Sequence, residues 1–198
     1  VILINNGLKS HGGDLAIGAY GIVNSVAFLF VMIVMGLNQG MQPIAGYNYG
    51  ALQMNRVIGV LRKTIFYATL ITTAGFLAGE LVPRLIVRIF TPDETLTDLA
   101  VYGMRITVMF FPLVGFQMVV SNFFQSIGMA KKAIFLSLTR QVIFLIPFLL
   151  ILPHFWGITG VWASLPAADF VAFVVAAIML VSQIRKFKAQ YALLTAEK

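Results

Sequence analysis

The sequence predicts an all-α polytopic membrane protein, built as a bundle of transmembrane helices. The 198 residues are 60% hydrophobic and only 11% charged, which is too apolar for an ordinary soluble domain of this size. The apolar residues also form runs that reach the length of about 20 helical residues needed to cross a hydrocarbon core. These runs show no alternation of period two, so a sheet or barrel is disfavoured.

Five runs reach that length with at most one charged residue inside each, and a shorter one precedes them. We expect full spans at 15–45, 64–83, 99–130, 133–153 and 157–184. The chain opens with Val1 and has no basic segment typical of a signal peptide, so we interpret residues 1–8 as the last turns of a helix that begins upstream. Residues 185–198 form a basic tail.

Basic residues mark alternate connections between the spans. They are Arg56, Arg62 and Lys63, then Lys131 and Lys132, then Arg185, Lys186, Lys188 and Lys198. The other connections hold fewer, Lys9, Arg84 and Arg88, beside Asp14, Asp93, Glu94 and Asp98. By the positive-inside rule we expect the C-terminal tail to be cytoplasmic.

Polar side chains interrupt two of the spans. The stretch GLNQGMQPIAGYNYGA, residues 36–51, contains Asn38, Gln39, Gln42, Pro43 and Asn48. The span 99–130 contains Gln117, Ser121, Asn122 and Gln125. A primary amide that faced lipid would leave donors and an acceptor unpaired. Interhelical hydrogen bonds would satisfy any one of these groups, but the two stripes together favour the lining of a substrate cavity. Asn48 and Pro43 fit a structural role where the helix ends.

Glycines and prolines in the spans predict close packing and kinks. Gly36 with Gly40, and Gly46 with Gly50, have the small-xxx-small spacing that permits helices to approach closely. Prolines within or at the end of spans remove a backbone hydrogen bond and bend the helix. They are Pro43, Pro112, Pro147 and Pro166.

Four ionisable residues fall inside the spans, where such residues are rare and need a partner or a role. Arg105 and Arg140 lie roughly 10 Å and 12 Å of helix inside the nearest predicted membrane edge, so both can reach the interface. Glu80 lies one turn from Arg84, so we expect a local ion pair between them. We assign these residues structural or interfacial roles.

Asp169 is the remaining ionisable residue within a span. It lies about 24 Å of helix from Arg185, and its own helix has no basic residue within reach. By the same count Arg140 is on the other side of the midplane, so direct pairing would need a long reach. Two interpretations stay open. Asp169 is a proton or cation relay, or it is a carboxylate held by amides or by an arginine that the depth count misplaces.

Four motifs, GLNQGMQPIAGYNYGA, SNFFQSIGMAKKA, RQVIFLIP and GITGVWASLPAAD, occur in this order and spacing. They resemble the second half of multidrug and toxic compound extrusion (MATE) transporters, over essentially the whole chain to about Ile184. The resemblance implies the C-terminal six-helix lobe of a twelve-helix transporter, with its first helix truncated and an N-terminal lobe as its partner. It also implies a secondary antiporter that exports cationic or amphipathic drugs or toxic metabolites against protons or sodium.

One feature departs from the pattern of the family. Some members use an acidic residue in their tenth helix as part of a cation site, but 105–128 contains no Asp or Glu. Coupling through the other lobe is therefore our preferred interpretation, with Asp169 second. Two alternatives stay open, a lipid-linked precursor or polysaccharide flippase of the same superfamily, and a structural membrane subunit that transports nothing.

Other classes of function find no support. The chain has no cysteine, and His11 and His154 fall in different predicted loops without an acidic partner, so we expect no metal and no cofactor. A nucleophile–base pair and the GxxxxGK[ST] phosphate loop are also absent, so we expect no enzyme. The basic residues form short clusters without interleaved aromatic residues, which disfavours nucleic acid. Membrane lipid is the expected surrounding, in a bacterial plasma membrane.

Overall fold

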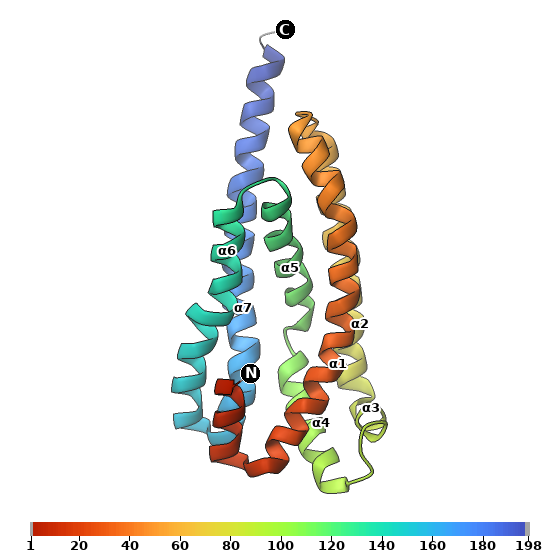
Figure 1. Ribbon diagram of the computed structural model, residues 1–198, viewed down its shortest axis with the longest axis vertical. Coiled ribbons are helices and arrows are strands. Elements are labelled where there is room, and N and C mark those ends of the chain that lie inside the picture. The colour runs from red at the N-terminus through yellow and green to blue at the C-terminus, as the bar shows by residue number, and fades with distance from the viewer. Residues whose placement is uncertain (1, 197–198) are drawn as a thin grey trace.

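The structure, a computed structural model, describes residues 2–196. Val1 and Lys198, which belong to the predicted truncated helix and basic tail, lie outside the described residues. Within 2–196 every regular element is a helix, which confirms the all-α prediction, and the helices run along one long axis (Figure 1). In chain order they are α1 (Ile2–Gly50), α2 (Met54–Leu81), α3 (Pro83–Arg88), α4 (Glu94–Val108), α5 (Phe111–Ser126), α6 (Ala130–Leu138), the π-helix η1 (Thr139–Phe144) and α7 (Leu145–Ala196).

Two glycines break the longest helices and reverse the chain. Gly13 in α1 has φ 68° and Gly157 in α7 has φ 53°, a backbone conformation that residues with a side chain rarely adopt. The two reversals lie against each other, because a Cβ added at Gly12 would come within 2.4 Å of the Ile158 side chain. The start of α1 therefore lies beside the first half of α7.

The helices account for five full passes along the bundle, in addition to the short segment of α1 before Gly13. Three continuous stretches, Leu3–Gly50, Met54–Leu81 and Ala130–Phe187, are long and apolar enough to cross a membrane, and α4 with α5 forms a fourth crossing bent by 52°. Pro112 stands at the start of α5, where the bend occurs. Because α7 reverses at Gly157, the stretch Ala130–Phe187 supplies two antiparallel passes (Figure 1). The polytopic helix bundle is confirmed.

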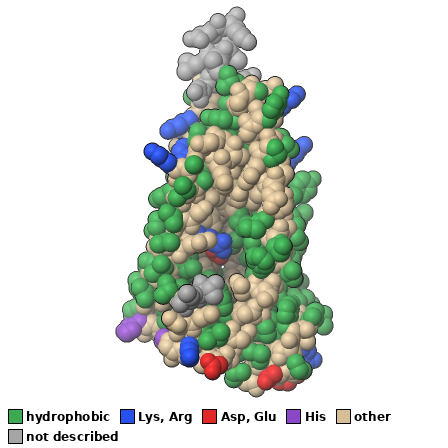
Figure 2. Space-filling view, in the orientation of Figure 1, with side chains coloured by type: hydrophobic (Ala, Val, Ile, Leu, Met, Phe, Trp, Pro, Cys, Tyr) green, Lys and Arg blue, Asp and Glu red, His purple; other side chains and the backbone are tan. Residues whose placement is uncertain are grey.

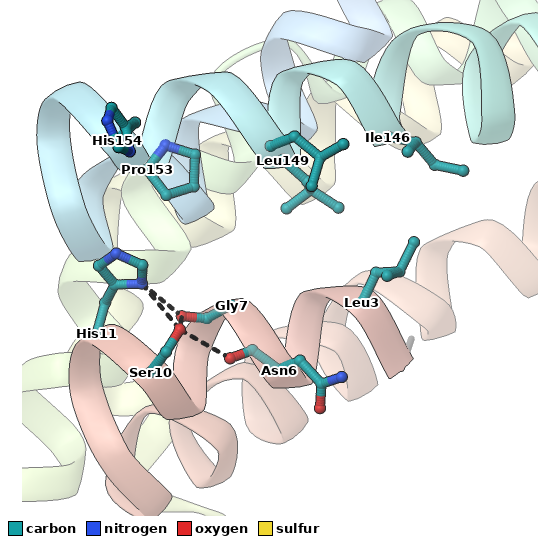
Figure 3. Close-up of a pocket in the computed structure, with 10 residues that line it drawn as sticks. Leu3, Asn6, Gly7, Ser10, His11, Ile146, Leu149, Pro153 and His154 are labelled. Atoms are coloured by element: carbon teal, nitrogen blue, oxygen red, sulfur yellow. Dashed lines mark hydrogen bonds between the residues drawn. The ribbon is translucent and has the colours of Figure 1, made fainter.

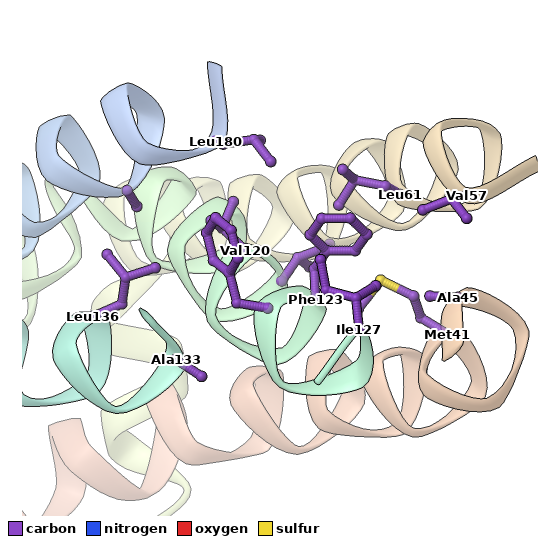
Figure 4. Packing of buried hydrophobic residues seen from close by; sticks show 14 of the residues in the cluster. Met41, Ala45, Val57, Leu61, Val120, Phe123, Ile127, Ala133, Leu136 and Leu180 are labelled. Carbon is purple, nitrogen blue, oxygen red and sulfur yellow. The ribbon is translucent and has the colours of Figure 1, made fainter. Parts of the chain in front are cut away.

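The connection expected between the first two full spans, which carries Arg56, Arg62 and Lys63, is mostly helical over residues 52–63. It is part of α2, which begins at Met54, and the side chains of Val57 and Leu61 are buried. They belong to a core cluster that joins α1, α2, α5, α6 and α7, in which Phe123, Leu136 and Met41 are also buried (Figure 4). The basic residues of this segment thus occupy the outer face of a packed helix.

Glycines lie at the closest contacts between helices, but not all of these glycines belong to the pairs that the sequence singled out. A Cβ added at Gly103 would lie 2.5 Å from the Trp162 ring, and one at Gly115 would lie 2.6 Å from Thr72 Oγ1. Of the four glycines in the two small-xxx-small pairs, Gly46 is close to the Ser126 carbonyl oxygen, at 2.9 Å for an added Cβ. Gly36, Gly40 and Gly50 have no such neighbour within 4 Å among the described residues, so the close approach that their spacing permits is not made within this part of the chain.

Charged side chains divide between the two ends of the bundle. On the face seen in Figure 2, the side chains near the end that carries the C-terminus are basic, whereas acidic and histidine side chains gather at the opposite end together with some basic ones. Hydrophobic side chains cover much of the surface between them. Many are large and exposed, such as Leu29, Leu81 and Leu150, as expected for a surface that faces lipid.

Candidate functional site

Asp169 forms an ion pair with Arg140. Arg140 Nε donates a hydrogen bond to Asp169 Oδ1 at 2.5 Å, and the two side chains are 32% and 10% exposed. The two side chains are thus in direct contact, although the depth count places them on opposite sides of the midplane and requires a long reach for pairing. The other interpretation of Asp169, a carboxylate held by an arginine that the depth count misplaces, matches the observed contact.

A second contact between the same two passes explains the error. Lys132 donates to Gln183 Oε1, so these two residues are level in the bundle. Eight residues separate Lys132 from Arg140, whereas fourteen separate Gln183 from Asp169. That difference corresponds to about 9 Å of helix rise. The long basic side chains and the irregular helix between them make up the difference, which a count along straight helices omits.

The irregular helix is η1, which carries Arg140. The amide of Leu145 donates to the Arg140 carbonyl, five residues back, as in a π-helix. Thr139 Oγ1 donates to the Phe135 carbonyl at 2.6 Å, a side-chain bond that often bends helices. Pro147 cannot donate to the carbonyl four residues before it. Short π-helical segments are rare and are frequent at functional sites.

The ion pair lies in a cavity of about 400 Å³. Figure 2 shows a basic and an acidic side chain together in a hollow midway along the visible face, away from the charged groups at both ends. The lining comes from both halves of α1, from η1 and from both halves of α7, so both glycine reversals are needed to assemble it. The lining residues are Ile4, Tyr20, Asn24, Arg140, Gln141, Leu145, Leu165, Ala168 and Asp169.

Three polar members of this lining were missed by the sequence argument. Tyr20 and Asn24 lie in the charge-free part of the first span, and Gln141 follows Arg140 directly. The rule that singled out Gln42 and Gln117, an amide inside an apolar run, applies equally to Asn24. Tyr20 carries no comparable signal, because a tyrosine in a membrane helix is compatible with ordinary packing against Trp162, whose ring centroid lies 6.0 Å away.

The predicted cavity amides separate into two groups. Gln42 Nε2 donates to Asn122 Oδ1 at 3.2 Å, which joins α1 to α5. Gln117 and Ser121 instead face α6, where they donate to the carbonyls of Leu136 and Ala133 at 3.4 and 3.3 Å. Interhelical hydrogen bonds thus account for part of what the sequence suggested as a cavity lining.

Other members of the set lack such a partner. Asn38 is only 2% exposed, and neither its Oδ1 nor its Nδ2 has a hydrogen-bond partner among the described residues. Gln39 and Gln125 are exposed on the surface of the bundle. The predicted residues therefore do not line one continuous cavity within this chain.

Two of the residues that were assigned structural or interfacial roles, Glu80 and Arg84, do not form the expected ion pair. Glu80 makes no ion pair within the described chain, and Arg84 pairs instead with Glu94, at 3.5 Å, and with Asp98. The expected pair fails because the helix breaks at Val82, whose φ and ψ of −130° and 37° are not helical, so the one-turn spacing no longer aligns the side chains.

The remaining members of that group lie near helix ends or within α1. Arg105 is exposed in the last turn of α4, where a positive charge is favourable to the helix dipole. Asn48 is buried and donates to the Ile44 carbonyl at 2.8 Å. Pro43 is exposed inside α1, and the helix continues past it to Gly50.

The two histidines share a second cavity of about 290 Å³ (Figure 3). His11 Nδ1 lies 3.0 Å from the Gly7 carbonyl and 3.1 Å from Ser10 Oγ. His154 reaches the same end of this cavity because α1 and α7 reverse side by side. Among the described residues no group of three His, Cys, Asp or Glu side chains could hold a metal ion.

Comparison with known proteins identifies relatives of this chain. The family model described as MatE matches residues 3–151. The multidrug export protein MepA of Staphylococcus aureus (strain MRSA252) is 27% identical over 184 residues, which cover 92% of this chain and 40% of MepA. MepA of Staphylococcus haemolyticus (strain JCSC1435) is 25% identical over 173 residues, covering 87% of this chain and 38% of that protein. The chain thus spans about 40% of the length of the curated relatives that it matches.

Comparison with solved structures also finds MATE transporters. The MATE multidrug transporter DinF-BH, solved in complex with a ligand, is 38% identical, with a TM-score of 0.78 over 88% of this chain and 39% of that one. The crystal structure of MATE in the bent conformation has a TM-score of 0.89 over 96% of this chain and 42% of the other. At 21% identity the second likeness concerns the fold alone. Because the MatE match covers most of the sequence, this chain belongs to the MatE family.

Proposed function

We propose that this chain is the C-terminal lobe of a secondary active multidrug efflux antiporter in a bacterial plasma membrane. The observation that carries the proposal is the MatE match over residues 3–151. It is supported by relatives named as multidrug export proteins and by the likeness to DinF-BH, a protein described as a multidrug transporter. These relatives are transporters, which favours a role without enzymatic chemistry.

The surface of α1 supports a partner lobe. Gly36 and Gly40 are exposed and have open space where a Cβ would be, and Gln39 is exposed beside them. Small residues and an amide on one exposed helix face suit contact with another helix or a water-filled space better than contact with lipid. The N-terminal lobe of the same transporter is the proposed occupant, and the remaining apolar surface faces membrane lipid.

The substrate is a drug or toxic metabolite of cationic or amphipathic character, exported by alternating access in exchange for protons or sodium. Cavity contacts are proposed for Asn38, Gln39, Gln42, Gln117, Ser121, Asn122 and Gln125. Asp169 stays a candidate coupling residue, but its pairing with Arg140 means that coupling through it requires the two side chains to separate. The C-terminal tail is cytoplasmic in this proposal, in agreement with the basic residues near that end of the bundle.

Exchange of ethidium, a cationic aromatic dye, across vesicles tests the proposal. The native polypeptide that carries this sequence is isolated from its membrane through a tag fused after Lys198 and reconstituted into liposomes. External radiolabelled ethidium should exchange with unlabelled ethidium inside, and an imposed proton or sodium gradient should drive its net movement. A structural subunit cannot exchange substrate, so absence of exchange by correctly folded protein would contradict the proposal. Movement of a lipid-linked precursor without ethidium exchange would favour the flippase alternative.

A further inference from the structure

We propose that the cavity around Arg140 and Asp169 is a binding site for zwitterionic ligands, with the guanidinium and the carboxylate each recognising one charge of the ligand. The cavity measures about 400 Å³ and is lined by both polar and apolar side chains. That size lies within the range of sites for small molecules, about 300–1,000 Å³. The ligand class follows from three features of the lining.

The first feature is unused hydrogen-bonding capacity. A guanidinium has five N–H donors, and the bond from Arg140 Nε to Asp169 Oδ1 uses one. The Nη groups of Arg140 and the Oδ2 of Asp169 make no hydrogen bond to any other described residue. The same holds for the side chains of Tyr20, Asn24 and Gln141, which also line the cavity. The bond between Arg140 and Asp169 is thus the one side-chain hydrogen bond among these five polar residues. Asn24 and Gln141 are exposed, so their donors and acceptors are accessible to a polar ligand that enters the cavity.

The second feature is the charge balance. Arg140 and Asp169 are the charged side chains of the described lining, and their formal charges cancel. A ligand with a single charge would be attracted by one of them and repelled by the other, and it would also lose hydration. A zwitterion can place its anionic group on Arg140 and its cationic group on Asp169, so that both contacts are attractive.

The third feature is the apolar part of the lining. Ile4, Leu145 and Leu165 come from three segments that are brought together by the two chain reversals. They would contact the body of a compact amphiphile whose charged groups reach the ion pair. The proposal concerns binding to this cavity, so it stands or falls separately from the export of ethidium.

Three photoreactive compounds that share a benzophenone group and differ in charge can test the site. They are 4-benzoylphenylalanine, which is zwitterionic, 4-benzoylbenzoate, an anion, and (4-benzoylbenzyl)trimethylammonium, a cation. The native polypeptide is irradiated with each compound over a range of concentrations. The labelled peptides are then mapped, and saturable labelling is measured in the peptides that contain the cavity residues. Arg105→Gln is the matched control, since it removes an exposed arginine of another helix.

Each variant should change the charge preference in a defined direction. The unmodified protein should bind the zwitterion about tenfold more tightly than either ion, the effect of one charged hydrogen bond. Arg140→Gln should shift the preference to the cation, Asp169→Asn should shift it to the anion, and Arg105→Gln should leave it unchanged. A structural role of the pair would weaken labelling by all three compounds together.

Two results would overturn the proposal. One is the same ranking of the three compounds in the unmodified protein and in Arg140→Gln. The other is saturable labelling that maps outside the cavity peptides. If Asp169→Asn does not fold, judged by size-exclusion chromatography, the shift in Arg140→Gln decides the question. The double variant Arg140→Gln with Asp169→Asn removes both charges and should show no preference.

Discussion

The molecule has two sets of ion pairs that differ in their surroundings. At the end where α3 meets α4, Arg84 pairs with Glu94 and Asp98, and Arg88 pairs with Glu94 at 2.5 Å. These side chains are 54–67% exposed. The pair in the cavity, Arg140 with Asp169, is 32% and 10% exposed.

The comparison indicates that the burial of an ion pair, and not its presence alone, decides how much the pair contributes to stability. Water and salt screen the exposed cluster, so each of its pairs should contribute about 0–1 kcal/mol. The cavity pair lies inside the bundle, where an unpaired charge is far more expensive. The exposed cluster therefore suits the anchoring of a loop at the membrane edge, whereas the cavity pair must be kept together or be given another partner.

The largest effect is expected from Asp169→Asn. It leaves the Arg140 charge without a partner inside the bundle, which should lower the free energy of unfolding by about 2–3 kcal/mol. This is below the roughly 3–5 kcal/mol of a fully buried pair, because a third of the Arg140 side chain is exposed. Unfolding of the native polypeptide in mixed detergent micelles measures the change. Asp98→Asn is the matched control in the exposed cluster, and an equal loss in both variants would remove the distinction between the two sets.

A smaller effect is expected from Gln42→Leu, which removes a neutral polar contact. Gln42 bonds Asn122 between α1 and α5, and such interhelical bonds in membranes contribute about 0.6 kcal/mol on average. The loss of stability should therefore be about 0.6 kcal/mol, well below that of Asp169→Asn. A loss from Gln42→Leu as large as that from Asp169→Asn would mean that charge is not what separates the cavity pair from its surroundings.

The smallest effect is expected from Arg84→Gln, whose screened pairs should place the cost in the lower half of the range of about 0–1 kcal/mol. Raising the salt concentration to about 1 M shortens the screening length to about 3 Å, so the difference from the unmodified protein should then vanish. The effect of Asp169→Asn should persist under the same conditions. Unfolding measured at both salt concentrations checks this, and a salt-sensitive cavity pair would show that water reaches it freely.

The sequence predicts the fold class well because apolar run length and charge alternation are strong signals in a membrane protein. The predicted span limits also fall close to both reversals, since Gly13 lies in the gap before the span 15–45 and Gly157 is the first residue of the span 157–184. It fails at 52–63, where three basic residues suggest a loop although Val57 and Leu61 follow the spacing of a buried helix face. The basic residues indicated a loop, whereas the apolar spacing indicated a helix. The segment is helical because its apolar side chains are packed against the core.

The site was less predictable, since it depends on how segments distant in the sequence meet. The Glu80–Arg84 expectation assumed a continuous helix, but Val82 breaks it. The depth count for Asp169 assumed straight helices, whereas Arg140 sits on a π-helix and reaches along the bundle. Tyr20 and Asn24 enter the cavity only because α1 and α7 reverse at adjacent glycines, which spacing within one span cannot reveal.

A double-mutant cycle on Arg140 and Asp169 tests the central claim most directly, namely that these residues form a coupled pair inside the bundle. The free energy of unfolding is measured for the native polypeptide, for Arg140→Gln, for Asp169→Asn and for the double variant, with the same cycle on Arg84 and Asp98. We expect a coupling energy above about 1.5 kcal/mol for the cavity pair and below about 1 kcal/mol for the exposed pair. Additive effects of Arg140→Gln and Asp169→Asn would contradict the account.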